Sequence, residues 1–181
     1  TEQKNVSRYA FDSVDGNAAG EMPAGLTVIT YYYIKESDVT AKYIDENTGK
    51  EIDGVDSVTT TYKEKDTYTT EKKTIDGYTY TKDTGNTSGT IVRDNIGVIY
   101  YYKKNAKITV KYLDKNTQEV VASEEIIDGL ERDEYITTQK TVDGYTFSNV
   151  VGDTNGEMPA GETTIIFYYI KQSKVITKYV D

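Results

Sequence analysis

The sequence contains no cysteine, no histidine and no tryptophan among its 181 residues. Without cysteine and histidine there are no disulfides, no zinc sites of the Cys/His type and no nucleophile of the Ser-His-Asp or Cys-His kind. A chain without cysteine also suits an exterior where thiols would oxidise, although cytosolic proteins can lack cysteine too. No apolar run approaches the roughly 20 residues that a membrane-spanning helix needs, so we expect no membrane insertion of this segment.

Basic residues are fewer than acidic ones. The chain carries 21 lysine and arginine residues against 30 aspartate and glutamate residues, which gives a net charge of -9. The phosphates of nucleic acid and anionic membrane surfaces would repel such a chain, so we expect neither as a partner. Nothing in the composition calls for a cofactor, and we expect none.

The abundant residues favour β-structure. The chain has 18 tyrosines and many threonines but only two prolines. Aromatic and β-branched side chains fill pleated surfaces well, and their content is too high for a disordered segment. The composition therefore predicts a mainly β fold.

The sequence repeats itself along its whole length. A shift of 69 positions places Tyr32 on Tyr101, and a shift of 67 positions places Tyr101 on Tyr168. The difference of two residues falls between positions 53 and 68, where we expect a loop of variable length. The predicted domains are the C-terminal part of one repeat at 1–38, full repeats at 39–107 and 108–174, and the first strand of a further repeat at 175–181. We expect the chain to be a slice of a longer tandem array.

Each repeat opens with a predicted strand followed by a turn. In "VTAKYID" (39–45), Val39, Ala41 and Tyr43 face one side of the strand and the residues between them face the other. The following "DENTG" (45–49) is typical of a turn, because Asp and Asn satisfy their own backbone and Gly tolerates positive φ. The repeat therefore begins as a half-buried strand.

The middle of the repeat is ambiguous. The stretch "KDTYTTEKK" (65–73) suits a short helix, with Asp66 as N-cap and basic residues at its end. Its threonines favour an extended strand nearly as well. The predicted fold class is therefore mainly β, with α+β as the alternative.

Each repeat closes on a strand with three adjacent aromatic residues. Side chains alternate along a strand, so the outer rings of a triplet share one face and the middle ring lies on the other. The outer rings are Tyr31, Tyr33, Tyr100, Tyr102, Phe167 and Tyr169. Phe167 has no hydroxyl, so that position needs a ring rather than a hydrogen bond, and this face is predicted to be the core. The middle rings all keep the hydroxyl, so we expect their face to be partly wet or packed on polar groups.

The middle tyrosines are the candidate binding residues. Sugars stack their C–H faces on aromatic rings, and hydroxyls can hold sugar oxygens. Tyr32, Tyr101 and Tyr168 are therefore candidate glycan contacts. The structural alternative is that tyrosine simply pairs well across a sheet.

The acidic residues suggest no catalytic or metal site. Turns such as "DENTG" place oxygens at alternate positions, but none has the full loop with a closing bidentate glutamate that a calcium site needs. The acid shared by the copies, Asp45, Asp114 and Asp181, begins a turn at a strand end, which is a capping position rather than a cleft. A small repeated unit is also a poor enzyme scaffold, because pockets need larger concave sites. We predict no catalytic residue, no metal site and no enzyme activity.

The pattern "VTAKYIDENTGKEI … YTTEKKTIDGYTYT … GNTSGT … VIYYYKK" (39–104) resembles the MucBP repeat, the mucin-binding-protein domain of Gram-positive surface proteins. The resemblance covers both full repeats and, in part, each end of the chain. Two places depart from the pattern. Gln118 stands where the first turn has Gly49, and the first copy has Ser7 and Arg8 where the other copies have Asp-Gly.

The resemblance implies small, β-grasp-like, ubiquitin-related domains arranged in tandem. It also implies a secreted, cell-wall-anchored adhesin that binds mucin or other host glycoprotein glycans. The alternative is a structural stalk that projects another binding domain from the wall, and direct protein–protein adhesion is a third hypothesis.

The links between repeats bear on the choice between these functions. About four residues, such as "KESD" (35–38), join one repeat to the next, which leaves little freedom between neighbours. We therefore expect a stiff, elongated, monomeric rod. Exposed middle tyrosines aligned along one side would favour binding, whereas burial at the repeat junctions would favour the stalk.

Overall fold

The computed structural model describes residues 1–180, and every helix or strand in this range is a β-strand. The strands are β1 (Tyr9–Asp15), β2 (Thr30–Asp45), β3 (Val58–Lys63), β4 (Thr67–Thr69), β5 (Tyr78–Thr84), β6 (Ser88–Thr90), β7 (Ile96–Asp114), β8 (Val120–Leu130), β9 (Glu134–Ile136), β10 (Tyr145–Val151), β11 (Asn155–Glu157) and β12 (Gly161–Lys171). The prediction of a mainly β fold is confirmed. None of the residues up to 180 belongs to a helix that could cross a membrane.

The helix offered as an alternative at 65–73 is wrong, because β4 lies there and pairs antiparallel with β6. Tyr68 is the central residue of β4 and is only 5% exposed. Its hydroxyl donates a hydrogen bond to the carbonyl of Asn86 at 3.1 Å. Gly89 lies opposite Tyr68 in β6, and a Cβ there would come within 3.2 Å of the ring. Pairing with β6 and the burial of Tyr68 therefore favour the strand over the helix.

The chain divides into two compact units. The first contains residues 1–74 and 80–102, and the second contains residues 75–79 and the chain from Lys103 onward. The strand β7 contributes its first part to the first unit and its second part to the second unit. The boundaries of a compact unit need not coincide with those of a sequence repeat, so the repeat boundaries expected from the sequence stay predictions.

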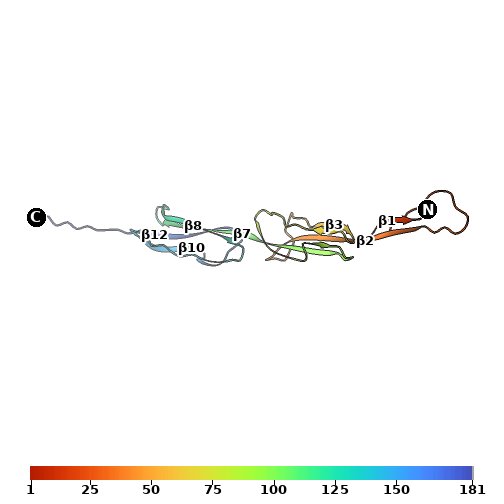
Figure 1. The fold of residues 1–181 in the computed structure, drawn as a ribbon. Coiled ribbons are helices and arrows are strands. Elements are labelled where there is room, and N and C mark those ends of the chain that lie inside the picture. Colours follow the sequence, from red (N-terminus) through yellow and green to blue (C-terminus); the bar gives the residue numbers. More distant parts are fainter. Residues whose placement is uncertain (181) are drawn as a thin grey trace. The chain divides into compact units, whose positions relative to one another are not determined.

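Equivalent strands are paired in the same arrangement in each of the two units (Figure 1). In the first unit, β2 pairs antiparallel with β3 and parallel with β7, and β5 also pairs with β7. In the second unit, β7 pairs antiparallel with β8 and parallel with β12, and β12 pairs antiparallel with β10. The first and last strands of each full repeat thus lie side by side, as expected for a β-grasp-like sheet. The strand β1 pairs antiparallel with the first part of β2.

Aromatic rings form the centre of the first unit. Tyr43 stacks on Tyr100 with ring centroids 5.7 Å apart and an interplanar angle of 13°. Tyr80 meets Tyr102 edge-on at 5.9 Å. Tyr100 and Tyr102, the outer rings of the second triplet, are 3% and 1% exposed. The prediction that the outer rings belong to the core is confirmed for this triplet, whereas Tyr31 and Tyr33 of the first triplet are only half-buried.

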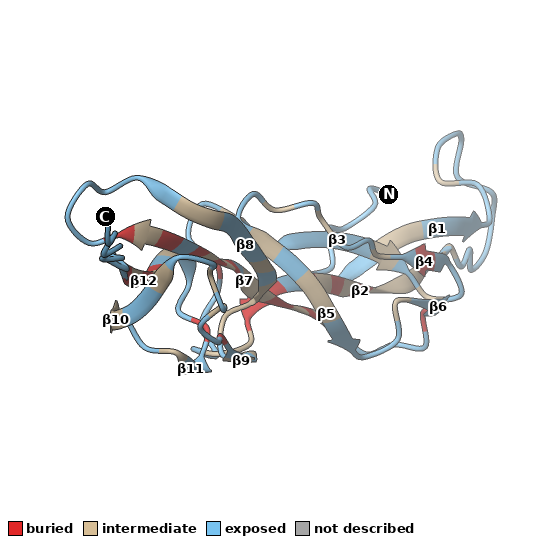
Figure 2. Cartoon of the chain, turned by 90° about the vertical axis from the view of Figure 1, so that its left-hand side faces the viewer, coloured by how far each residue is buried: buried red, intermediate tan, exposed pale blue. Residues whose placement is uncertain are grey.

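The second unit repeats this ring arrangement with two phenylalanines. Tyr112 stacks on Phe167 at 5.5 Å and 18°, and Phe147 meets Tyr169 edge-on at 6.0 Å and 76°. Buried segments alternate with less buried ones along β12 in Figure 2. The same stack forms with Tyr100 in the first unit and with Phe167 in the second, so this position needs a ring but no hydroxyl, as the sequence predicted.

Two of these buried tyrosines hold a backbone segment over the core. The hydroxyl of Tyr102 accepts a hydrogen bond from the N–H of Lys73 at 2.9 Å and donates one to the carbonyl of Lys73 at 2.8 Å. Tyr169 makes the same two bonds with Lys140, at 2.9 and 2.8 Å. A phenol that is both donor and acceptor satisfies both polar groups of one residue, so a non-helical segment can cover the core.

The shared acidic residue at the end of the opening strand caps a turn. Asp45 is 4% exposed, and its Oδ1 accepts hydrogen bonds from the N–H groups of Asn47 and Thr48 at 2.9 and 3.0 Å. Asp114 is 3% exposed and binds the two equivalent N–H groups at 2.7 and 3.1 Å. The carboxylate replaces solvent for these donors, which is the capping role that the sequence indicated.

The same turn yields a stability prediction. Gly49 has φ of 69° and Gln118, its counterpart in the second unit, has φ of 61°. A residue with a side chain pays about 1–2 kcal/mol to adopt this left-handed region. Glycine avoids this cost but makes the unfolded chain more flexible, which offsets part of the gain in stability. We expect Gln118→Gly to stabilise the second unit by roughly 0.5–1 kcal/mol, and Gly49→Gln to destabilise the first by a similar amount. Urea denaturation of the two variants checks this; a loss of stability in Gln118→Gly would contradict it.

The strand expected at 175–181 does not form within the described residues. Residues 172–180 contain no strand, and Asp181 lies outside the described range. The equivalent residues of β2 and β7 are paired on both sides, whereas no described strand pairs with 175–180. An unpaired strand has no stability of its own, so the assignment of this segment to a further repeat stays a prediction.

Candidate binding surfaces

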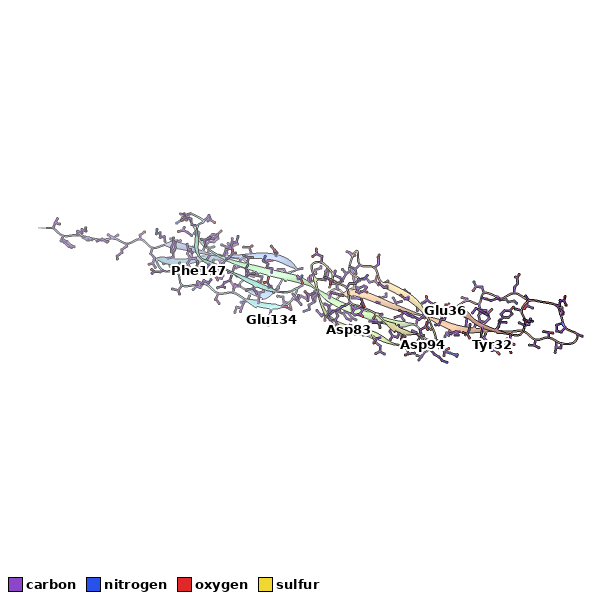
Figure 3. The ribbon with its side chains drawn as sticks, turned by 45° about the horizontal axis from the view of Figure 1, so that its top comes forward. Tyr32, Glu36, Asp83, Asp94, Glu134 and Phe147 are labelled. Carbon is purple, nitrogen blue, oxygen red and sulfur yellow. The ribbon has the colours of Figure 1, made fainter. Side chains whose placement is uncertain are left out.

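The middle tyrosines lie on the face of the sheet opposite the core rings, and none of the three is buried. Tyr32 is 50% exposed, and Tyr101 and Tyr168 are half-buried. Figure 3 shows Tyr32 on the β1–β2 hairpin, where it is paired with Ser13. Tyr168 is paired with Asn149 in the same way. Tyr32 and Tyr101 belong to the first unit and Tyr168 to the second.

Polar groups lie next to two of the middle tyrosines, Tyr101 and Tyr168. The Nζ of Lys82 lies 5.3 Å from the ring centroid of Tyr101, within reach of a cation–π contact. Glu46 forms an ion pair with Lys82 at 2.5 Å and accepts a hydrogen bond from Thr81 at 2.6 Å. The hydrogen bond from Lys82 to Glu46 raises the pKa of that ammonium. In the second unit, the hydroxyl of Tyr168 lies 3.4 Å from Oε1 of Gln118.

The first unit also contains a pocket that the sequence analysis missed. It lies between the core face of β2 and β3 and the segment that follows β4, and its volume is about 350 Å³. We call it the Lys73 pocket; it is lined by Val39, Ala41, Tyr43, Val58, Thr60, Tyr62, Thr69, Thr70, Glu71, Lys72 and Lys73. The Nζ of Lys73 lies 4.3 Å from the ring centroid of Tyr43 and donates to the carbonyl of Asp56 at 2.8 Å. The sequence signal that could have located this pocket is the difference between the repeats at one equivalent position, which is Val58 in the first unit and Glu125 in the second.

The acidic residues do not gather into a metal site in the part of the chain that the structure describes. Within residues 1–180, no group of three or more acidic side chains is placed to hold a metal ion. The turn aspartates Asp45 and Asp114 point instead at backbone N–H groups. A hydrogen-bonded turn therefore accounts for these acids.

The fold and these surfaces define the class of protein. The chain consists of all-β tandem repeats with a buried aromatic core and partly exposed tyrosines on the other face of the sheet. The MucBP domain matches residues 1–34, 38–103 and 107–170. The chain therefore belongs to the MucBP domain family, the adhesin-type and generally non-enzymatic repeats of Gram-positive surface proteins.

Two relatives come from Listeria monocytogenes. Internalin J of serovar 1/2a is 32% identical over 179 residues, which cover 94% of this chain and 21% of that protein. Internalin J of serotype 4b is 32% identical over 181 residues, which cover 95% of this chain and 19% of that protein. The chain thus spans only about a fifth of the length of these relatives.

Solved structures of other surface repeats resemble the chain weakly. Streptococcal High Identity Repeats in Tandem (SHIRT) domains 3-4 from a cell surface protein give a TM-score of 0.27 at 14% identity, over 75% of this chain and 98% of that one. The type 2 repeat of the mucus binding protein MUB from Lactobacillus reuteri gives 0.26 at 16% identity, over 75% and 100%. TM-scores of this size do not establish that the folds are the same.

Proposed function

We propose that the repeats form a segment of an extracellular, cell-wall-anchored adhesin that binds the glycans of mucin or other host glycoproteins. Tyr32, Tyr101 and Tyr168 are the proposed contacts. The observation that supports this is their partial exposure on the face opposite the core, together with polar partners such as Lys82 and Gln118. A ring edged by charged and amide groups offers both a stacking surface and hydrogen bonds to a sugar.

Each such contact would be weak, because the tyrosines lie on an open face of the sheet with little enclosure. Linked repeats raise the overall affinity by making each later contact intramolecular. We therefore expect binding to rise with the number of intact tyrosine sites rather than to depend on a single one.

The experiment is binding of the chain to immobilised mucin, before and after enzymatic removal of the glycans. The variant Tyr32→Ala/Tyr101→Ala/Tyr168→Ala, checked for folding, should bind at least about tenfold more weakly, because avidity multiplies the lost contacts. Tyr9→Ala/Tyr179→Ala serves as the control, since these tyrosines are 42% and 93% exposed but lie outside the triplets. Equal binding by the folded triple variant and the wild type would remove the tyrosine face from the proposal.

A stalk is the second candidate function. The strands β2 and β7 run without interruption through the short links at 35–38 and 104–107, so no flexible coil lies at either position. Such links suit a stiff, monomeric, elongated rod that holds another domain away from the wall. No binding of wild-type chain to mucin at high concentration, with an extended particle in small-angle scattering, would favour the stalk.

A further inference from the structure

The two units differ at one equivalent position on the core face of an edge strand. Val58 in β3 is paired with Ala41 of β2. Its equivalent in β8 is Glu125, which is paired with Val110 of β7. The same place in the fold therefore carries a methyl-bearing side chain in the first unit and a carboxylate in the second.

The second unit shows what this place does with a carboxylate. The Nζ of Lys140 lies 2.7 Å from Oε1 of Glu125, and the hydroxyl of Tyr112 donates to its Oε2 at 3.1 Å. The hydrogen bond from Lys140 holds the pKa of Glu125 below its ordinary value. Burial and the bond to Glu125 raise the pKa of Tyr112 to about 12, so the phenol remains a donor at neutral pH. An ammonium and a phenol together thus hold a carboxylate here.

The first unit keeps the ammonium in the same arrangement without the carboxylate, and the Tyr43 hydroxyl donates instead to the carbonyl of Glu71 at 3.1 Å. The Nζ of Lys73 lies 4.3 Å from the Tyr43 ring, as that of Lys140 does from the Tyr112 ring. Lys73 donates to the carbonyl of Asp56 at 2.8 Å, and Lys140 makes the equivalent bond to Ser123 at 2.8 Å. Among residues 1–180, no carboxylate pairs with Lys73. The ammonium is therefore positioned by its neighbours, with its charge left for a ligand.

The space next to Lys73 is large enough for one small molecule. The Lys73 pocket measures about 350 Å³, at the lower end of ligand sites, which run from roughly 300 Å³ upward. Its floor is apolar, with Val39 and Ala41 each 2% exposed. Thr60 and Tyr62 line it from β3 and bring a hydroxyl and a second ring. Lys72 also lines the pocket and offsets Glu71, the single acidic residue of the lining.

We propose that the Lys73 pocket binds a sugar carboxylate, with the ligand's acid group in the place that Glu125 occupies in the second unit. The sugar ring then lies against Val39, Ala41 and Tyr62, and the Lys73 ammonium holds the acid group. This site lies on the core face of the sheet, apart from the middle tyrosines. The proposal rests on the proposed function only for the ligand class, since a carboxylated sugar is one kind of host glycan.

The test is a titration of the isotope-labelled chain with glucuronate, followed by its amide NMR spectrum. Glucose is the matched neutral probe, because it differs from glucuronate only in the carboxylate. We expect glucuronate to shift the amides of residues 58–62 and 69–73 and glucose to leave them unchanged at the same concentration. No shift with glucuronate, or equal shifts with both sugars, would overturn the proposal.

Two variants locate the site. Val58→Glu places a carboxylate where the second unit carries one, so it should fold normally and bind glucuronate at least about tenfold more weakly, the effect of one charge-assisted hydrogen bond. Lys73→Met keeps the packing over Tyr43 and removes the charge, and it should weaken binding as much. Thr59→Glu is the control, because it adds the same charge to the opposite face of β3 and should bind as the wild type does. Unchanged affinity in folded Val58→Glu would exclude the pocket.

Two sources of this chemistry are separated by a second pair of probes. N-acetylneuraminate represents acidic sugars at the ends of glycan chains, and a glucuronate-containing disaccharide represents acidic sugars within a polysaccharide. The probe that binds the wild type more tightly, and whose binding is lost in Val58→Glu, identifies the source. If Val58→Glu binds both probes as tightly as the wild type does, the site is excluded. Mucin binding by the tyrosine face is measured separately on Val58→Glu, so either proposal can fail while the other stands.

Discussion

Gly85→Ala should destabilise the first unit by about 3 kcal/mol, near the upper end of the cost of a strained backbone residue. Gly85 has φ of +88°, which a residue with a Cβ rarely adopts. A Cβ at Gly85 would overlap the carbonyl oxygen of Gly97, which belongs to the central strand β7. That contact cannot be relieved by a side-chain rotation, so either β7 or the turn after β5 must move.

Two other glycines make a graded control for this prediction. Gly54 has φ of +75° with no atom within 4 Å of its Cβ position, so Gly54→Ala carries the backbone cost alone, about 1 kcal/mol. Gly152 is the counterpart of Gly85 in the second unit, and its nearest neighbour is the side chain of Ile165 at 3.3 Å. Gly152→Ala should therefore fall between the other two.

Urea denaturation monitored by hydrogen exchange and mass spectrometry separates these effects, because its peptides report each unit individually. Gly85→Ala should lower the protection of β7 peptides at 98–102 and leave the β12 peptides unchanged, and Gly152→Ala should do the reverse. Equal losses in Gly85→Ala and Gly54→Ala would show that φ alone, and not the contact with Gly97, sets the cost.

The faces of the strands could be predicted because they depend on local order alone. Alternation along a strand assigned Tyr100 and Tyr102 to one face and Tyr101 to the other before any partner strand was known. The turn after Asp45 was predictable for a similar reason, since its hydrogen bonds join residues two and three apart. Local chemistry was sufficient for both features.

The segment at 65–73 could not be predicted, because residues far away decide its conformation. Its own residues favour helix and strand about equally, and the bonds that hold Lys73 come from Tyr102, which lies 29 residues away. The Lys73 pocket depends in the same way on Val58, which joins Lys73 in its lining only once β3 has paired with β2. Glycan binding by Tyr32, Tyr101 and Tyr168 stays a prediction, since exposure alone does not distinguish a contact from a well-hydrated strand residue.

Tyr102→Phe should destabilise the first unit by about 2–3 kcal/mol, because it removes two hydrogen bonds and leaves both the N–H and the carbonyl of Lys73 unpaired. Tyr102 is 1% exposed, so water does not replace the phenol without opening the core. The loss falls on the segment between β4 and β5, which has no helix of its own to hold it in place.

Tyr100→Phe is the matched control, since the second unit already carries Phe167 at this position. Within residues 1–180, the Tyr100 hydroxyl bonds only to the hydroxyl of Thr70, at 2.9 Å, and the Thr70 hydroxyl also donates to the carbonyl of Thr87 at 3.2 Å. Removing it strands no backbone group, so the cost should stay below about 1 kcal/mol. Exchange of the Lys73 amide should accelerate in Tyr102→Phe alone, while the Lys140 amide, held by Tyr169, keeps its protection in both variants. Equal destabilisation by the two variants would mean that the pair of bonds to Lys73 does not anchor the segment, and that ring packing alone holds it over the core.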